Sequence, residues 1–87
     1  MITIWKYPLR IISEPQEISF PGENGKVSLV AVQNGVLCLW IVVDTSGPET
    51  IRRFQVVGTE HELPKNAKTL IGGVQMGPFV WHVVELL

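Results

Sequence analysis

The sequence predicts an all-β protein: a small antiparallel sandwich or partly open barrel of about seven short strands, with little or no helix. Val, Ile, Thr, Trp and Phe are frequent, and no window of about 11 residues keeps the 3.6-residue apolar period of a helix. Turn signals rich in Gly, Pro, Asn and Ser recur every 8–12 residues, as in small sandwiches and barrels. The length of 87 residues corresponds to one domain, 1–87.

The central segment 26–44 predicts a hairpin around Asn34-Gly35. This residue pair is typical of a two-residue type I′ turn, in which both positions need φ > 0. The expected facing pairs are Leu29 with Trp40, Ala31 with Cys38, and Val27 with Val42. Because both faces of such a hairpin are apolar, we expect both to be covered.

Shorter patterns predict the remaining strands. The expected ranges are 2–7 before Pro8, 17–20, 51–58, 69–76 and 79–86, with a polar surface loop at 59–68. The last two strands form a hairpin around Gly77-Pro78, in which Val74 faces Trp81 and Ile71 faces Val84. In the strand 51–58, alternation puts Arg52 on one side with Phe54 and Arg53 on the other.

The composition favours self-association. Hydrophobic residues make up 46% of the chain and charged residues 17%, and the mean hydropathy is +0.27. So small a domain has a limited core of its own, so we expect an apolar sheet face to be buried in a homo-oligomer. The residues expected in this interface or in the core are Leu29, Trp40, Val42 and Trp81.

Charge and cysteine content exclude several classes of function. A net charge of −1 and a pI of about 6.1 argue against binding to duplex nucleic acid. The single cysteine, Cys38, allows no disulfide within the chain, which indicates a reducing, cytoplasmic compartment. The apolar stretch 27–43 is interrupted by its polar turn, so we expect no membrane span.

No catalytic residue, metal site or cofactor is predicted, and the protein is not expected to be an enzyme. Cys38 lies within a strand and is expected to be a buried structural thiol. Glu60-His61-Glu62 and His82 lack the ligand spacing that marks metal sites. A small hydrolase would need His61, His82 and a glutamate to converge in one pocket.

Aromatic and cationic side chains suggest a site for a small anionic, nucleotide-like ligand. Aromatic faces stack on bases, and cations pair with phosphates. The candidate residues are Trp5, Lys6, Tyr7, Arg52, Arg53 and His61. Strand alternation places Lys6 on the face opposite Trp5 and Tyr7, and the tryptophans fit core or interface roles equally well.

The chain resembles a family of small phage and prophage proteins of unknown function. The matching motifs are Ile-Trp-Lys-Tyr-Pro-Leu at 4–9, the Val-Gln-x-Gly-x-x-Cys-Leu-Trp pattern at 32–40, Gly-Thr-x-His at 58–61, the Ile-Gly run at 70–74, and Trp-His-Val at 81–83. The chain departs from the family pattern at Glu60, where the family more often has glycine, and this puts a tight turn at that position in doubt.

The resemblance implies a phage gene product in the host cytoplasm but carries no established activity. We therefore expect a non-enzymatic binding protein that self-associates and counters host defence by binding a host protein or a small anionic ligand. The alternatives are a minor virion or assembly protein and, less favoured, a small hydrolase.

Overall fold

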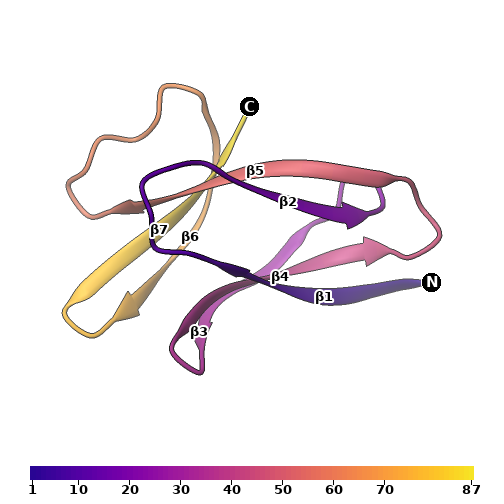
Figure 1. The fold of residues 1–87 in the computed structure, drawn as a ribbon, viewed down its shortest axis with the longest axis horizontal. Helices are drawn as coiled ribbons and strands as arrows, with labels where there is room; N and C mark the ends of the chain where they lie inside the picture. Colours follow the sequence, from indigo (N-terminus) through magenta and orange to yellow (C-terminus); the bar gives the residue numbers. More distant parts are fainter.

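The computed structural model describes residues 1–87 as seven β-strands without a helix (Figure 1). It therefore holds no helix that could cross a membrane. The strands are β1 (Ile2–Leu9), β2 (Gln16–Pro21), β3 (Val27–Gln33), β4 (Val36–Asp44), β5 (Glu49–Gly58), β6 (Ala67–Met76) and β7 (Phe79–Leu86).

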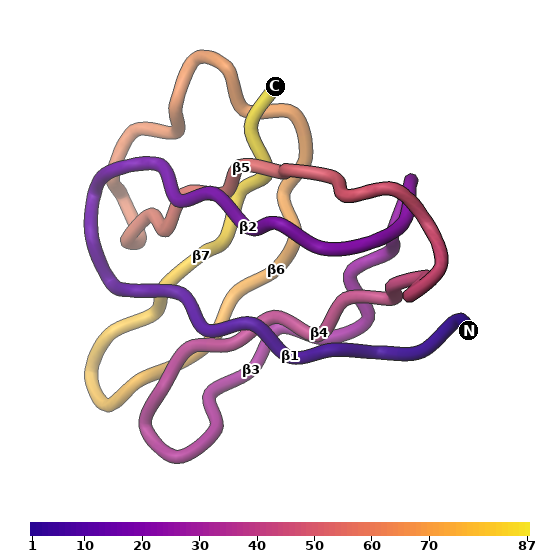
Figure 2. The backbone as a smooth tube through the Cα atoms, turned by 45° about the vertical axis from the view of Figure 1, so that its right-hand side comes forward, coloured from indigo at the N-terminus to yellow at the C-terminus, as the bar shows by residue number.

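The strands form two antiparallel sheets that pack face to face. The first sheet has the order β1-β4-β3 and the second the order β2-β5-β7-β6. The edge strands β3 and β6 lie against each other on one side of the molecule, and Figure 2 follows the chain as it passes between the sheets. No ladder joins the sheets, so the all-β prediction is confirmed in its sandwich form, and the closed barrel is not formed.

The central hairpin forms as the Asn34-Gly35 signal predicts. Both turn residues have positive φ, 51° at Asn34 and 77° at Gly35, as a type I′ turn requires. The predicted pairs Leu29–Trp40 and Ala31–Cys38 are confirmed. The predicted pair Val27–Val42 is wrong, because a β-bulge between Val27 and Leu29 shifts the register and sets Val27 opposite Ile41.

In the last hairpin, too, a β-bulge shifts one of the predicted pairs. Val74 faces Trp81 as predicted, but Leu70 takes the place opposite Val84 that Ile71 was predicted to fill. A bulge between Leu70 and Gly72 causes this shift. Bulges are common in edge strands, and β6 is one.

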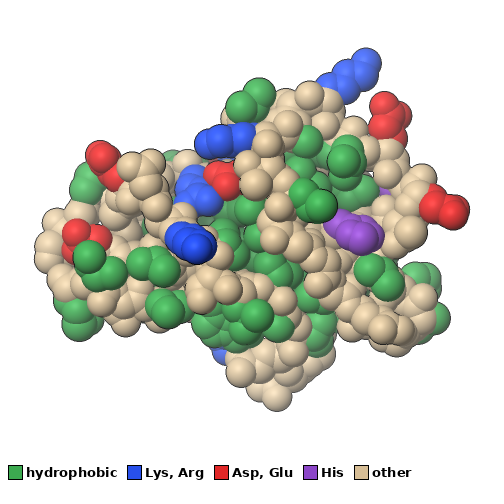
Figure 3. Space-filling model, turned by 180° about the vertical axis from the view of Figure 1, so that it is seen from behind, with side chains coloured by type: hydrophobic (Ala, Val, Ile, Leu, Met, Phe, Trp, Pro, Cys, Tyr) green, Lys and Arg blue, Asp and Glu red, His purple; other side chains and the backbone are tan.

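The core lies between the sheets and settles which face of the central hairpin is internal. The fully buried side chains of β4 are Leu37, Leu39, Ile41 and Val43, and they pack with Phe20, Phe54 and Val83. Trp40, Val42 and Leu29 therefore point away from the core, on the outer face of the first sheet. Cys38 also lies on that side, yet it is buried, as predicted for a structural thiol. Viewed from behind, hydrophobic side chains gather across the middle of the molecule and acidic ones lie mostly toward its rim (Figure 3).

The outer face of the second sheet is covered only in part, since Ile51 and Leu70 point to that side and are 61% and 62% exposed. Val57 and Val84 point to this outer side, but they are only 5% and 1% exposed. In the connection between β5 and β6, Leu63 lines a hollow together with Val57 and Leu70. The predicted polar loop thus has a packing role.

One partly buried ion pair lies among the apolar residues of the second sheet, with the Arg52 and Glu85 side chains 19% and 9% exposed. Arg52 of β5 donates from Nε and Nη2 to the two carboxylate oxygens of Glu85 on β7, each at 2.7 Å. Its Nη1 donates to the carbonyl oxygen of Gly25, which precedes β3. The guanidinium carbon also lies 5.6 Å and 5.7 Å from the ring centres of Phe20 and Phe54.

Glu85→Gln is expected to destabilise the fold by about 2 kcal/mol, because it leaves the partly buried Arg52 charge without its counter-charge. Urea unfolding followed by tryptophan fluorescence measures this change. The matched control is Glu17→Gln, because Glu17 is exposed and forms no ion pair. Equal stability of the two variants would show that the Arg52–Glu85 pair does not hold the sheet.

Candidate ligand-binding site

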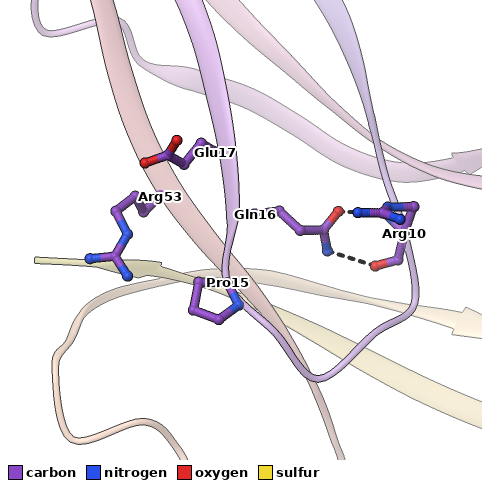
Figure 4. A pocket seen from close by; sticks show the side chains of 5 residues that line it. All are labelled: Arg10, Pro15, Gln16, Glu17 and Arg53. Atoms are coloured by element: carbon purple, nitrogen blue, oxygen red, sulfur yellow. Dashed lines mark hydrogen bonds between the residues drawn. The ribbon is translucent and has the colours of Figure 1, made fainter.

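A polar, open pocket of about 510 Å³ lies where β1 leads into β2. It is lined by Arg10, Pro15, Gln16, Glu17 and Arg53, and it has no hydrophobic wall (Figure 4). Two of these five residues are arginines, which makes this pocket the strongest candidate for an anionic ligand.

Strand alternation directs Arg53 to this pocket. Arg52 points into the core with Phe54, so its neighbour Arg53 must point to the opposite side of the second sheet. Across the ladder, Glu17 of β2 is the residue paired with Arg53. The pocket therefore has one carboxylate on the same strand pair as its cation.

Gln16 fixes the second arginine. Its side-chain oxygen accepts a hydrogen bond from the backbone N–H of Arg10 at 2.8 Å, and its Nε2 donates to the Arg10 carbonyl oxygen, also at 2.8 Å. Figure 4 shows both bonds. Because Gln16 binds only the peptide groups of Arg10, the guanidinium stays free to contact a ligand.

The two guanidinium groups lack acidic partners. The ion pairs of the molecule are Arg52–Glu85 and a contact of the N-terminal ammonium with Asp44. Arg53 makes one long hydrogen bond, 3.5 Å from Nη1 to the carbonyl oxygen of Leu87, and the Arg10 side chain makes none. The residues that line the pocket thus carry two positive charges and one negative charge, a net positive charge.

The other predicted ligand residues lie elsewhere. Arg52 forms its ion pair with Glu85 inside the sandwich, so its guanidinium group does not reach the pocket. Lys6 lies on the outer face of the first sheet and donates from Nζ to Gln33 Oε1 at 2.7 Å. The structure therefore brings neither of them to the Arg10–Arg53 pocket.

Trp5 and Tyr7 point to the opposite side from Lys6, as alternation predicts. Trp5 stays 42% exposed because β1 is an edge strand. Tyr7 packs toward Phe20, with ring centres 6.3 Å apart. Burial raises the pKa of the Tyr7 hydroxyl, and the Glu49 carboxylate raises it further.

His61 lines a second, apolar pocket of about 210 Å³ beside Trp81. Its walls include Ile11 and Ile12, from the same connection that carries Arg10. A side chain at Gly58 would have its Cβ 3.2 Å from both His61 Nδ1 and Trp81 Cζ3, so glycine at this position lets the two rings approach the backbone.

Thr59, Glu60, His61 and His82 line one further hollow of about 240 Å³. His82 is half-buried, and its Nε2 lies 3.0 Å from Thr59 Oγ1. His61, His82 and Glu60 therefore line the same hollow. This is the arrangement that a small hydrolase would need. No hydrogen bond joins either imidazole to a carboxylate, so a group that orients a base is missing from the hollow.

Sequence reasoning missed Arg10, Gln16 and the Arg52–Glu85 pair. The pair had a signal: Arg52 shares a side with Phe54, and Glu85 lies in the apolar run of β7, so two opposite charges occupy core positions. No sequence signal pointed to Arg10, because its position depends on the path of the connection between the two sheets.

A family model described as a domain of unknown function (DUF7352) matches residues 1–87. No curated protein and no solved structure matches the chain significantly.

Glu60 adopts the left-handed backbone conformation, with φ = 71°. The His61 N–H donates to the Gly58 carbonyl oxygen at 3.1 Å, so the turn closes although a non-glycine residue occupies it. The doubt that Glu60 raised about a tight turn is thus resolved. The chain accepts a local strain of about 1 kcal/mol at this position.

Glu60→Gly is expected to stabilise the protein by up to about 1 kcal/mol, because glycine takes positive φ without strain. The gain in the free energy of unfolding can be measured in urea. Asn24→Gly is the control: Asn24 has φ = 57°, but asparagine tolerates this conformation, so little change is expected. If Glu60→Gly is less stable than the native chain, the backbone at Glu60 is not strained.

Proposed function

We propose a function for this chain, which belongs to the DUF7352 family of unknown function, from the chemistry of its site. The protein is a non-enzymatic binder that holds a small anionic ligand between Arg10 and Arg53. The ligand class is one that carries phosphate or carboxylate groups, because planar guanidinium groups bind both in a bidentate manner.

One observation supports this proposal above the others. Arg10 and Arg53 line one open pocket, and neither forms an ion pair, although the chain as a whole is slightly acidic. A cation without an acidic partner is free to pair with an anion from solution. An anion bound in this pocket would therefore compete with no carboxylate that already holds either arginine.

The resemblance to small phage proteins supports a biological setting for such binding. In the host cytoplasm, a protein that sequesters an anionic signalling molecule would counter a defence that depends on it. Binding to a host protein would serve the same purpose through a larger surface. A minor virion or assembly role is the alternative, and it predicts the protein in purified particles.

The second candidate function is a small hydrolase, and the hollow around His61 and His82 favours it. The Thr59–His82 contact pairs a hydroxyl with an imidazole, the elements of an activated nucleophile. It ranks second because no carboxylate holds either ring in place.

Arg53→Glu is expected to weaken the binding of inorganic pyrophosphate at least tenfold, equivalent to about 1.4 kcal/mol, while the fold stays intact. The affinity is measured at low salt by isothermal titration calorimetry. Lys65→Glu carries the same charge change at an exposed position outside the pocket. If both variants lose the same affinity, binding reflects net charge alone and the Arg10–Arg53 site is wrong.

The leading proposal predicts no turnover of phosphate monoesters, phosphodiesters or simple esters by the purified protein. Turnover that disappears in His82→Gln, with circular dichroism unchanged, would replace it with the hydrolase. Arg53→Glu serves as the comparison, because Arg53 does not line the hollow around His82.

A further inference from the structure

We propose that the apolar pocket beside Trp81 is a binding site for a small, neutral, planar heterocyclic ring. The pocket has a volume of about 210 Å³ and is lined by the connection between β1 and β2, the end of β5, and Trp81 near the start of β7. It shares no lining residue with the anion pocket, so it binds its ligand independently of Arg10 and Arg53.

Two flat rings line the pocket and make it a place for stacking. Trp81 is half-buried, packs against the core and stacks with Phe79 at a ring-centre distance of 5.8 Å. The exposed imidazole of His61 lines the pocket with it, and both rings approach the backbone at Gly58. Aromatic rings pack on other flat rings in offset or edge-to-face geometry, which a saturated ring cannot reproduce.

The pocket favours an uncharged group. No Asp, Glu, Lys or Arg lines it, and its walls include the aliphatic side chains of Ile11, Ile12 and Val56. A charged group that moved from water into these surroundings would lose hydration without gaining a counter-charge. The occupant is therefore neutral, in contrast to the ligand of the anion pocket.

Three lining side chains offer hydrogen bonds to such a ring. The Ser13 hydroxyl, the His61 imidazole and the Trp81 indole N–H form no hydrogen bond within the chain. The chain leaves no buried side-chain nitrogen or oxygen without a partner, so these three groups are open to solvent. Small-molecule sites combine apolar walls with a few polar groups that orient the ligand, which favours a heterocycle over a plain hydrocarbon.

The walls of the pocket are held in place by the chain itself. Gln16 fixes the connection between β1 and β2 through its two hydrogen bonds to the peptide groups of Arg10. On the opposite wall, the His61 N–H donates to the Gly58 carbonyl oxygen and closes the turn that carries the imidazole. A ligand therefore need not order these segments, which keeps the entropic cost of binding low.

The volume limits the occupant to one compact ring system. Pockets for drug-sized ligands measure roughly 300–1,000 Å³. At about 210 Å³ this pocket is smaller, so most of a long acyl chain would stay outside it. Glycine at position 58 preserves the space, because a Cβ there would lie 3.2 Å from both His61 Nδ1 and Trp81 Cζ3.

Titration of the ¹⁵N-labelled protein with benzimidazole, a neutral planar heterocycle, tests the proposal by NMR. We expect saturable shifts of the Trp81 indole N–H and of the Ile11 and Ile12 amides, while the Trp40 indole N–H on the first sheet stays unchanged. Cyclohexanol, a ring that is not planar, is expected to bind at least tenfold more weakly. Equal affinity for the two probes, or no saturable shift at Trp81, would overturn the proposal.

Gly58→Ala is expected to weaken benzimidazole binding at least tenfold, because the added Cβ presses on the rings of Trp81 and His61. Gly72→Ala is the matched control. A Cβ at Gly72 meets only Val30, at an ordinary contact distance of 3.6 Å, and Gly72 does not line this pocket. Neither glycine has a positive φ, so both backbones accept alanine.

Ile11→Glu, with Ile51→Glu as its control, gives the same test if Gly58→Ala does not fold. Ile11 is 39% exposed and lines the pocket, whereas Ile51 is 61% exposed and does not. The first variant is expected to lose benzimidazole binding, because the ring would strip water from the new carboxylate. The second is expected to bind as the native chain does. Equal binding by a pocket variant and its control would overturn the proposal, whatever the result with pyrophosphate.

Discussion

The buried pair of Arg52 and Glu85 is the interaction on which the sandwich depends. It joins β5 to β7 within the second sheet, and through the Gly25 carbonyl it also holds the start of β3 in the first. Opposite charges inside an apolar core are tolerated only when both are paired and hydrogen-bonded. One guanidinium group thereby places three strands relative to one another. Aliphatic packing alone does not specify this arrangement.

The adjacent arginines of β5 show how a strand separates structure from function. Arg52 forms an ion pair on the core side of the sheet. The next residue, Arg53, lines the open pocket together with Arg10. The alternation of side chains is the whole cause, because both residues have the same chemistry. The first sheet uses the same device: Ile41 enters the core while its neighbour Trp40 faces outward.

Much of the fold could be predicted from the sequence, and less of the site. All seven strands and the pairs nearest each turn follow from Asn34-Gly35, Gly77-Pro78 and alternation. The pairs of Val27 and Ile71 were wrong because bulges in edge strands leave no sequence signal that alternation can detect. Of the site, Arg53 was among the candidates, whereas Arg10 reaches the pocket through a connection whose path depends on tertiary packing.

The topology has a consequence for the synthesis of the chain. β2 belongs to the second sheet, but its partner β5 follows about 30 residues later, after the whole first sheet has been made. At ordinary rates of translation, Ile18 and Phe20 wait for some seconds on a strand without a neighbour. A half-made molecule therefore presents a completed hairpin beside an unpaired apolar strand, and it is in this interval that the nascent protein is most open to misassembly or to capture by a chaperone.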